Sequence, residues 1–134
     1  MPAAYQINTI THMNSTVKDL FIYLFDLSPL EVNLLFLLIK TKKSMTLEQL
    51  SQRINRDKST VFRALQKLVR LGICLKDAKM IKEGGYYHLY AATDTQILKI
   101  ETEKRVKEIK ESFDRLLGKF EDDLNKMADH YNVL

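Results

Sequence analysis

Basic and hydroxyl side chains recur between residues 58 and 71, and they are the residues of this sequence best suited to chemistry. Serine and threonine hydroxyls can bond base edges or phosphates, and arginine can bond guanine through two hydrogen bonds. The candidates are Lys58, Ser59, Thr60, Arg63, Lys67 and Arg70. Contacts with phosphates set register, whereas contacts with base edges read sequence. We therefore expect the first four to approach bases and the last two to meet phosphates.

These side chains need a rigid helix to carry them, and the apolar residues of the same segment predict one. Val61, Leu65 and Leu68 recur at helical spacing and form a stripe that would face a core. The basic residues fall on a different face. Gly72 follows at the position where a left-handed helix cap is expected. The pattern thus predicts a helix over residues 58–71, held by one face and open to a ligand on the other.

The preceding residues predict a short helix and a tight turn. Thr46 is followed three residues later by Gln49, which is the spacing of a capping box. Asn55-Arg56-Asp57 then forms a polar turn, in which Arg56 is a further candidate for contact with DNA. A short helix, a turn and a basic helix can lie across the major groove, because the groove admits one helix.

Two more helices are expected before this motif. Ser28 can cap a core helix that continues to residue 39, with Pro29 in its first turn. Asn14 or Ser15 can start another, whose apolar face comprises Val17, Leu20, Phe21, Leu24 and Phe25. Residues 1–13 show no clear period.

A β-hairpin is expected after the basic helix. Residues 73–77 and 86–91 have the composition of short strands, and Glu83-Gly84-Gly85 lies between them. Lys79 and Lys82 place positive charge near the tip of this hairpin, residues 77–86. A basic loop of this kind can reach flanking backbone or the minor groove, although exposed lysines in a turn are also ordinary.

The last segment, residues 94–131, is expected to be one long charged helix. Its apolar residues alternate in steps of three and four, as in a coiled-coil seam, with one extra step of four before residue 124. The seam consists of Val106, Ile109, Phe113, Leu116, Phe120, Leu124 and Met127. An isolated helix would expose this surface, so we expect it to pair with a second copy of the chain. The alternative is that it folds back along residues 17–25.

Charge is distributed unevenly along the 134 residues. Residues 41–90 carry eleven basic and four acidic side chains, a net charge of +7, whereas residues 1–40 and 91–134 have net charges of −1 and −2. A basic block of this kind is what phosphate binding requires. We see no secretory signal and no apolar run long enough to cross a bilayer. A cytoplasmic, nucleoid-associated protein without a membrane partner is therefore expected.

Catalysis is not expected from these residues. His12, His88 and His130 are scattered, and none has the spacing of a metal ligand relative to Cys74. No glycine-rich phosphate loop is present. We therefore predict no catalytic residues, no metal and no cofactor. Tyr86, Tyr87 and Tyr90 could line a crevice for a small-molecule effector, but their more ordinary role is strand packing.

Residues 28–93 resemble the winged helix-turn-helix of the MarR and TrmB-type regulators of archaea and bacteria. The resemblance is carried by residues 27–31, 46–50, 57–65 and 68–73, in particular Ser59-Thr60-Val61 and Leu71-Gly72-Ile73. It implies a homodimer on a palindromic operator, with Ser59, Thr60, Arg63 and Lys67 facing DNA and residues 79–85 as the wing. Asp77-Ala78-Lys79 stands where MarR proteins usually have Asp-x-Arg. The TrmB-type sugar-binding domain is not carried over, because the chain ends after one helix.

Together these patterns predict a mainly α fold with a small β-hairpin wing (α+β). We expect an N-terminal arm and helix (1–27), a winged helix-turn-helix (28–93) and a C-terminal dimerisation helix (94–134). The predicted function is sequence-specific binding of double-stranded DNA in transcription regulation, as a repressor. Two alternatives stay open: a weakly specific architectural DNA-binding protein, and a winged helix that contacts other proteins of the transcription machinery.

Overall fold

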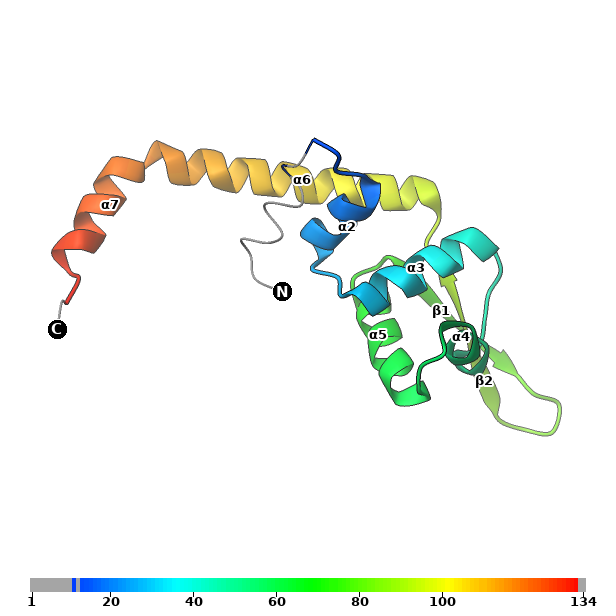
Figure 1. The fold of residues 1–134 in the computed structure, drawn as a ribbon. Coiled ribbons are helices and arrows are strands. Elements are labelled where there is room, and N and C mark those ends of the chain that lie inside the picture. The colour runs from blue at the N-terminus through cyan, green and yellow to red at the C-terminus, as the bar shows by residue number, and fades with distance from the viewer. Residues whose placement is uncertain (1–10, 12, 133–134) are drawn as a thin grey trace. The chain divides into compact units, whose positions relative to one another are not determined.

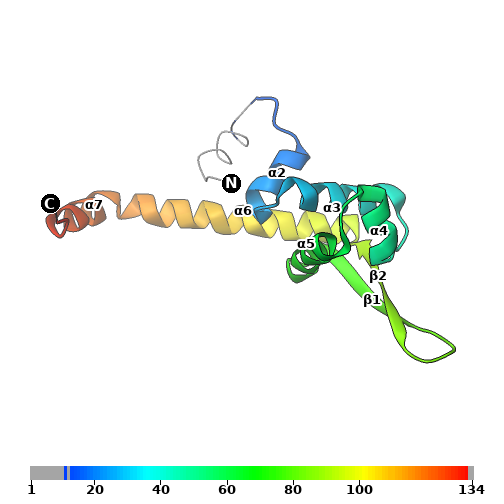
Figure 2. The same ribbon diagram turned by 60° about the horizontal axis from the view of Figure 1, so that its bottom comes forward.

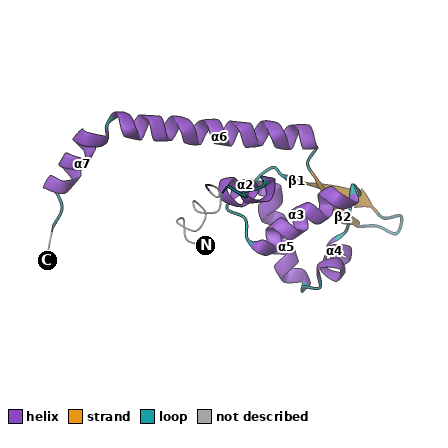
Figure 3. Ribbon diagram, turned by 45° about the horizontal axis from the view of Figure 1, so that its top comes forward, coloured by secondary structure: helices purple, strands orange, loops and turns teal. Residues whose placement is uncertain are grey.

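The computed structural model describes residue 11 and residues 13–132 of the chain. It is mainly helical with one antiparallel hairpin, as predicted (Figures 1 and 3). In chain order the elements are α2 (Val17–Phe25), α3 (Pro29–Thr41), α4 (Leu47–Ile54), α5 (Lys58–Arg70), β1 (Cys74–Met80), β2 (Tyr86–Ala92), α6 (Thr95–Gly118) and α7 (Phe120–Asp129). The chain divides into two compact units after Lys99.

Capping boxes start α2, α3 and α4, because each has an acidic or amide side chain three residues after a hydroxyl. In α3 the backbone N–H of Glu31 donates to Ser28 Oγ over 3.2 Å, and the N–H of Ser28 donates to Glu31 Oε1 over 2.8 Å. This start is the predicted one. The cap of α2 is Thr16 rather than the predicted Asn14 or Ser15, since only Thr16 has Asp19 at the matching distance.

The connection between α4 and α5 is short and consists of three residues, 55–57. Asn55 ends α4 in the left-handed region, at φ 59°, and its N–H donates to the carbonyl of Gln52. Asp57 then caps α5 through the backbone N–H of Thr60 at 3.0 Å. The result is the predicted short helix, turn and longer helix.

A Schellman motif ends α5 and directs the chain into the hairpin. The N–H of Ile73 donates to the carbonyl of Leu68, and the N–H of Gly72, at φ 79°, donates to that of Val69. The strands that follow pair from Cys74 with Ala92 to Met80 with Tyr86. They are therefore longer than the predicted 73–77 and 86–91. The hairpin projects beyond the helices of the first unit (Figure 2).

The core of the first unit lies where α3 and α5 meet, with α4 and the base of the hairpin packed around them. Its fully buried side chains include Leu34, Leu35 and Leu38 of α3, Leu50 of α4, and Val61, Leu65 and Leu68 of α5. Met45 and Tyr90 pair as a backbone bridge that joins the start of α4 to β2. The basic helix thus packs against three elements, α3, α4 and β1.

The prediction of one continuous helix over residues 94–131 is wrong. The helix ends at Gly118, Lys119 has non-helical φ and ψ of −115° and 11°, and α7 begins at Phe120. Glycine has low helix propensity because its backbone loses more conformational entropy in a helix than that of other residues. The break therefore falls at Gly118. The N–H of Asp123 donates to the carbonyl of Lys119 over 2.9 Å and starts the next helix.

Candidate nucleic-acid interface

Helix α5 has two clearly different faces. Val61, Ala64, Leu65 and Leu68 are buried, and the opposite face is exposed. The exposed face follows the spacing i, i+4, i+7 and i+11, so its side chains form one row along the helix. We call this row the outward stripe: Ser59, Arg63, Gln66 and Arg70.

Gln66 is a member of the outward stripe that the sequence prediction missed. Its side chain is exposed between those of Arg63 and Arg70. Glutamine can bond adenine with two hydrogen bonds in the major groove, so it belongs among the candidates for base contact. The signal was present in the spacing, because residue 66 lies three positions after Arg63 and seven after Ser59.

Thr60 lies at the edge of α5, half-buried, and its hydroxyl takes part in the helix cap. Thr60 Oγ1 donates to Asp57 Oδ1 over 2.7 Å, and the Thr60 N–H donates to Asp57 Oδ2. These hydrogen bonds from Thr60 hold the pKa of the Asp57 carboxyl below its usual range. The geometry therefore gives Thr60 a structural role at the start of α5.

Lys58 bridges the two helices of the helix-turn-helix. Its Nζ donates to Glu48 Oε1 over 2.8 Å, and both side chains are exposed. The hydrogen bond and the positive charge of Lys58 lower the pKa of Glu48. An exposed pair of this kind contributes little to stability.

Lys67 differs from the other predicted contacts, because it faces the body of the unit. Its Nζ lies 2.9 Å from Glu31 Oε1 and also donates to the carbonyl of Asp26, and only 25% of its side chain is exposed. Within the described part of the chain, neither Arg63 nor Arg70 has an ion-pair partner. The pairing of Lys67 argues against the predicted contact with phosphate.

Arg56 is exposed in the turn between α4 and α5. It lines an open hollow of about 510 Å³ together with residues that include Gln52 and Lys58. Ser51 also lines this hollow, and its buried Oγ has no hydrogen-bond partner within the described residues. The turn thus adds a cationic side chain next to the N-terminus of α5.

The hairpin carries the predicted lysines in two different settings. Lys79 lies on β1 with its Nζ 3.4 Å from Asp77 Oδ2, whereas Lys82 is exposed in the loop. The loop is closed by the N–H of Gly84 to the carbonyl of Ile81 and by the N–H of Ile81 to that of Gly85. Gly84 and Gly85 have φ values of 98° and 87°, which favour glycine.

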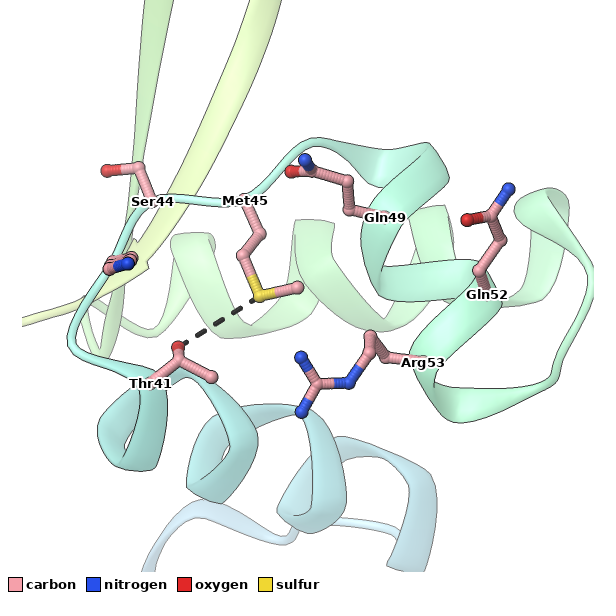
Figure 4. A pocket seen from close by; sticks show the side chains of 7 residues that line it. Thr41, Ser44, Met45, Gln49, Gln52 and Arg53 are labelled. Atoms are coloured by element: carbon pink, nitrogen blue, oxygen red, sulfur yellow. Dashed lines mark hydrogen bonds between the residues drawn. The ribbon is translucent and has the colours of Figure 1, made fainter.

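Two further hollows adjoin α4. One, of about 430 Å³, is lined by Thr41, Met45, Gln49 and Arg53 among others, and the Thr41 hydroxyl reaches Met45 Sδ at 4.0 Å (Figure 4). The other, of about 460 Å³, is lined in part by Phe62, Tyr87 and Tyr90. Of the three tyrosines for which strand packing was the favoured role and a crevice the other possibility, Tyr87 and Tyr90 line this hollow, and the described lining does not include Tyr86.

The predicted seam of the C-terminal unit is exposed in the single chain. Val106 and Ile109 are partly exposed, and Phe113 is 54% exposed. Leu116, Phe120, Leu124 and Met127 are exposed further along. Leu117, which the prediction omitted, is exposed as well. It allows steps of four, three, four and three from Phe113 to Met127, so the seam continues across the break at Lys119.

A helix-turn-helix followed directly by a two-stranded hairpin defines the winged helix-turn-helix class of transcription regulators. The basic outward stripe lies on the second helix of that motif, which is the recognition helix of the class. The fold and the site therefore agree on the class of protein.

Comparison with known proteins gives the family. The model of the family described as sugar-specific transcriptional regulator TrmB matches residues 24–96, which is more than half of the chain. The chain therefore belongs to the TrmB family of transcriptional regulators. A relative from Methanocaldococcus jannaschii, the uncharacterised protein MJ1503, is 32% identical over 109 residues, which cover 81% of this chain and 79% of the relative.

Several solved structures share the fold. A possible transcriptional regulator from Methanosarcina mazei has a TM-score of 0.72 at 21% identity, over 78% of this chain and 88% of its own. The ST1889 protein of Sulfolobus tokodaii has a TM-score of 0.59 at 21% identity, over 71% of this chain and 92% of its own. A mutant of S. aureus MepR bound to an oligodeoxyribonucleotide has a TM-score of 0.50 at 17% identity, over 96% of this chain and 97% of its own. At these identities the likeness concerns the fold alone.

The described residues form no helix that combines the length and the apolar character needed to cross a bilayer. Nor do they bring together three or more His, Cys, Asp or Glu side chains that could hold a metal ion.

Proposed function

We propose that this chain binds specific double-stranded DNA sequences through α5 and represses transcription from them. The observation that carries the proposal is the outward stripe. It presents a hydroxyl, two guanidinium groups and an amide in one row, on a helix whose opposite face is fixed in the core. Side chains of these types can read bases in the major groove.

Each residue of the stripe has a distinct proposed role. Ser59 and Arg63 lie in the first half of α5, where a recognition helix approaches base edges, and Gln66 extends base contact by one turn. Arg70, at the end of the helix, meets a phosphate. Arg56 and Lys82 add phosphate contacts from the turn and from the wing, and Lys58 does so by leaving Glu48.

We further propose that residues 28–93 are the DNA-binding part of a homodimer. The exposed apolar seam of α6 and α7 supports this, because a monomer would leave seven or more large apolar side chains of this region in water. A two-fold dimer places two recognition helices about 34 Å apart, one turn of the duplex. The MepR mutant of similar fold, which is bound to an oligodeoxyribonucleotide, supports DNA as the ligand.

The test is fluorescence anisotropy of the purified chain with duplex DNA from the region upstream of its own gene. A scrambled duplex of equal length and composition is the control, and both are titrated over a series of salt concentrations. We expect a steep loss of affinity with salt, because phosphate contacts release counterions. We also expect tighter binding to the native duplex at every salt concentration.

Other outcomes would favour the two alternatives. Steep salt dependence with equal binding of both duplexes would favour a weakly specific architectural protein. Absence of binding at low salt would contradict contact with DNA and favour a winged helix that binds proteins.

A further inference from the structure

The tip of the hairpin carries an apolar pair that phosphate binding does not explain. Met80 and Tyr86 are the last cross-strand pair before the loop. Their exposed fractions are 86% and 64%, and Ile81 beside them is also exposed. Lysines alone would suffice for a wing that only meets phosphates, so this pair calls for a second contact.

The pair is not part of the core. Within the hairpin only Cys74 and Tyr90 are buried, both near its base. Tyr86 lies four residues beyond Tyr90, which corresponds to about 13 Å at the rise of a β-strand. Met80 and Tyr86 thus lie at the exposed tip of the hairpin, away from the helices.

The Tyr86 ring is held in place although it is exposed. It makes an edge-to-face contact with His88, with ring centroids 5.2 Å apart and planes at 76°. The hydrogen bonds that close the loop at Ile81 fix the backbone next to Met80. A side chain held in this way can enter a narrow space at a small loss of conformational entropy.

The surroundings of the pair favour DNA as its partner. Lys76 shares its face of the hairpin, because residues two and four apart on a strand point the same way, and Lys82 follows in the loop. The tip and α5 lie on the same side of the first unit, opposite α2 (Figures 1 and 2). A duplex against α5 would therefore extend toward the tip.

We propose that Met80 and Tyr86 act as an apolar wedge that enters the minor groove, opens one base step and kinks the DNA. The minor groove is about 6 Å wide, which admits two side chains but no helix. Apolar side chains inserted between base pairs bend duplexes by about 20–90° toward the major groove. The flanking lysines hold the phosphates on each side. This proposal rests on the proposed function.

The test measures bending separately from binding. A duplex is first selected from a random-sequence library with the wild-type chain and labelled at its two ends with a donor and an acceptor fluorophore. Energy transfer in the saturated complex reports the bend. We expect the wild-type chain to shorten the end-to-end distance, and the double variant Met80→Ser with Tyr86→Ser to leave the duplex nearly straight.

Two control variants distinguish bending by the wedge from the effect of lost charge and from a general loss of structure in the hairpin. Tyr87→Ser alters the neighbouring tyrosine, which is 44% exposed and points to the opposite face of β2; it should leave the bend unchanged. Lys82→Ala should reduce the salt dependence of binding and keep the bend. Circular dichroism checks that every variant is folded, which is expected because all four positions are exposed.

The outcomes are distinct. Selection of no duplex would contradict the proposed function and the wedge with it. A selected duplex that stays straight with the wild-type chain would overturn the wedge alone. Equal bending by the wild-type chain and the double variant would also overturn it.

Discussion

At the scale of single residues, the neighbours of a basic side chain decide whether it can meet DNA. Lys67 and Arg70 are three positions apart on α5 and look equivalent in sequence. Lys67 is bound to Glu31 and to the carbonyl of Asp26, whereas Arg70 is exposed on the outward stripe. The distinction comes from Glu31 of α3 and from Asp26 at the C-terminal cap of α2, not from α5.

We expect Arg70→Ala to reduce the salt dependence of DNA binding and Lys67→Ala to leave it unchanged. Each lost phosphate contact lowers the slope of log affinity against log salt concentration by about 1. Lys67→Ala should instead lower the denaturant midpoint, because it removes the partly buried ion pair with Glu31. Anisotropy titrations at several salt concentrations and urea unfolding measure the two effects. Equal slopes for the two variants would contradict this assignment.

Arg63→Ala is expected to weaken binding to the preferred duplex by about 1–3 kcal/mol, because a base contact through two hydrogen bonds is lost. Binding to a scrambled duplex should change much less. Arg115→Ala, an exposed arginine of α6, is the matched control. Anisotropy at near-physiological salt measures both, and unchanged binding by Arg63→Ala would remove this residue from the interface.

At the scale of elements, glycine marks two helix ends for different reasons. Gly72 has a φ of 79° and ends α5, whereas Gly118 lacks a positive φ, and a Cβ at either position would meet no atom within 4 Å. Space is thus equal at the two sites, and only the backbone conformation differs.

We therefore expect opposite effects from the same substitution. Gly72→Ala should lower the free energy of unfolding by about 1–2 kcal/mol, because an L-residue in the left-handed region is strained. Gly118→Ala should raise the free energy of unfolding by up to about 1 kcal/mol, or raise the helix content, since alanine has the higher helix propensity. Thermal unfolding followed by circular dichroism compares them. A loss of stability in both would show that the break at residues 118–119 is needed for the fold.

The seam of α6 and α7 yields the prediction for association. Phe113→Asp should convert the proposed dimer to a monomer, because a carboxylate in an apolar interface loses its hydration without gaining a partner. Lys110→Asp, at an exposed position one turn earlier, is the control for charge. Sedimentation velocity measures the state of both. A dimer of unchanged strength in Phe113→Asp would exclude the seam as the interface.

At the scale of the whole molecule, one apolar core fixes α5 and the wing together. Cys74 lies at the end of that core, on the first residue of β1, and burial raises the pKa of its thiol to about 12. Burial also raises the pKa of the Tyr90 hydroxyl. Folding thus favours the neutral form of each group more strongly than the unfolded chain does.

Stability is accordingly expected to fall in alkaline solution. The unfolded thiol has the ordinary pKa of 9.0 and the folded one about 12, so the folded chain holds the proton more tightly. The contribution to stability is complete below pH 9 and is lost as the pH rises toward 12. Urea unfolding between pH 8 and 11 measures it. Cys74→Ala should lose stability less steeply over this range, and equal slopes would contradict the assignment.

Much of the fold could be predicted from the sequence, because the signals are local. The boxes at Ser28 and Thr46 join residues three positions apart, the buried stripe of α5 follows helical spacing, and Gly72 supplies its own backbone conformation. Each depends on contacts within about one helical turn. The break at Gly118 was missed because a heptad pattern continues across it, and the pattern reports side chains rather than backbone geometry.

Only the tertiary structure decided which polar side chains are open to a ligand. Lys67 is held in an ion pair by Glu31, which lies 36 positions earlier in the chain, whereas Arg70 on the same helix is exposed. The hairpin tip likewise extends beyond the helices because the core buries only Cys74 and Tyr90, near the base of the hairpin. Periodicity tells which face of a helix is apolar, but partners far apart in the chain settle what each side chain on the other face contacts.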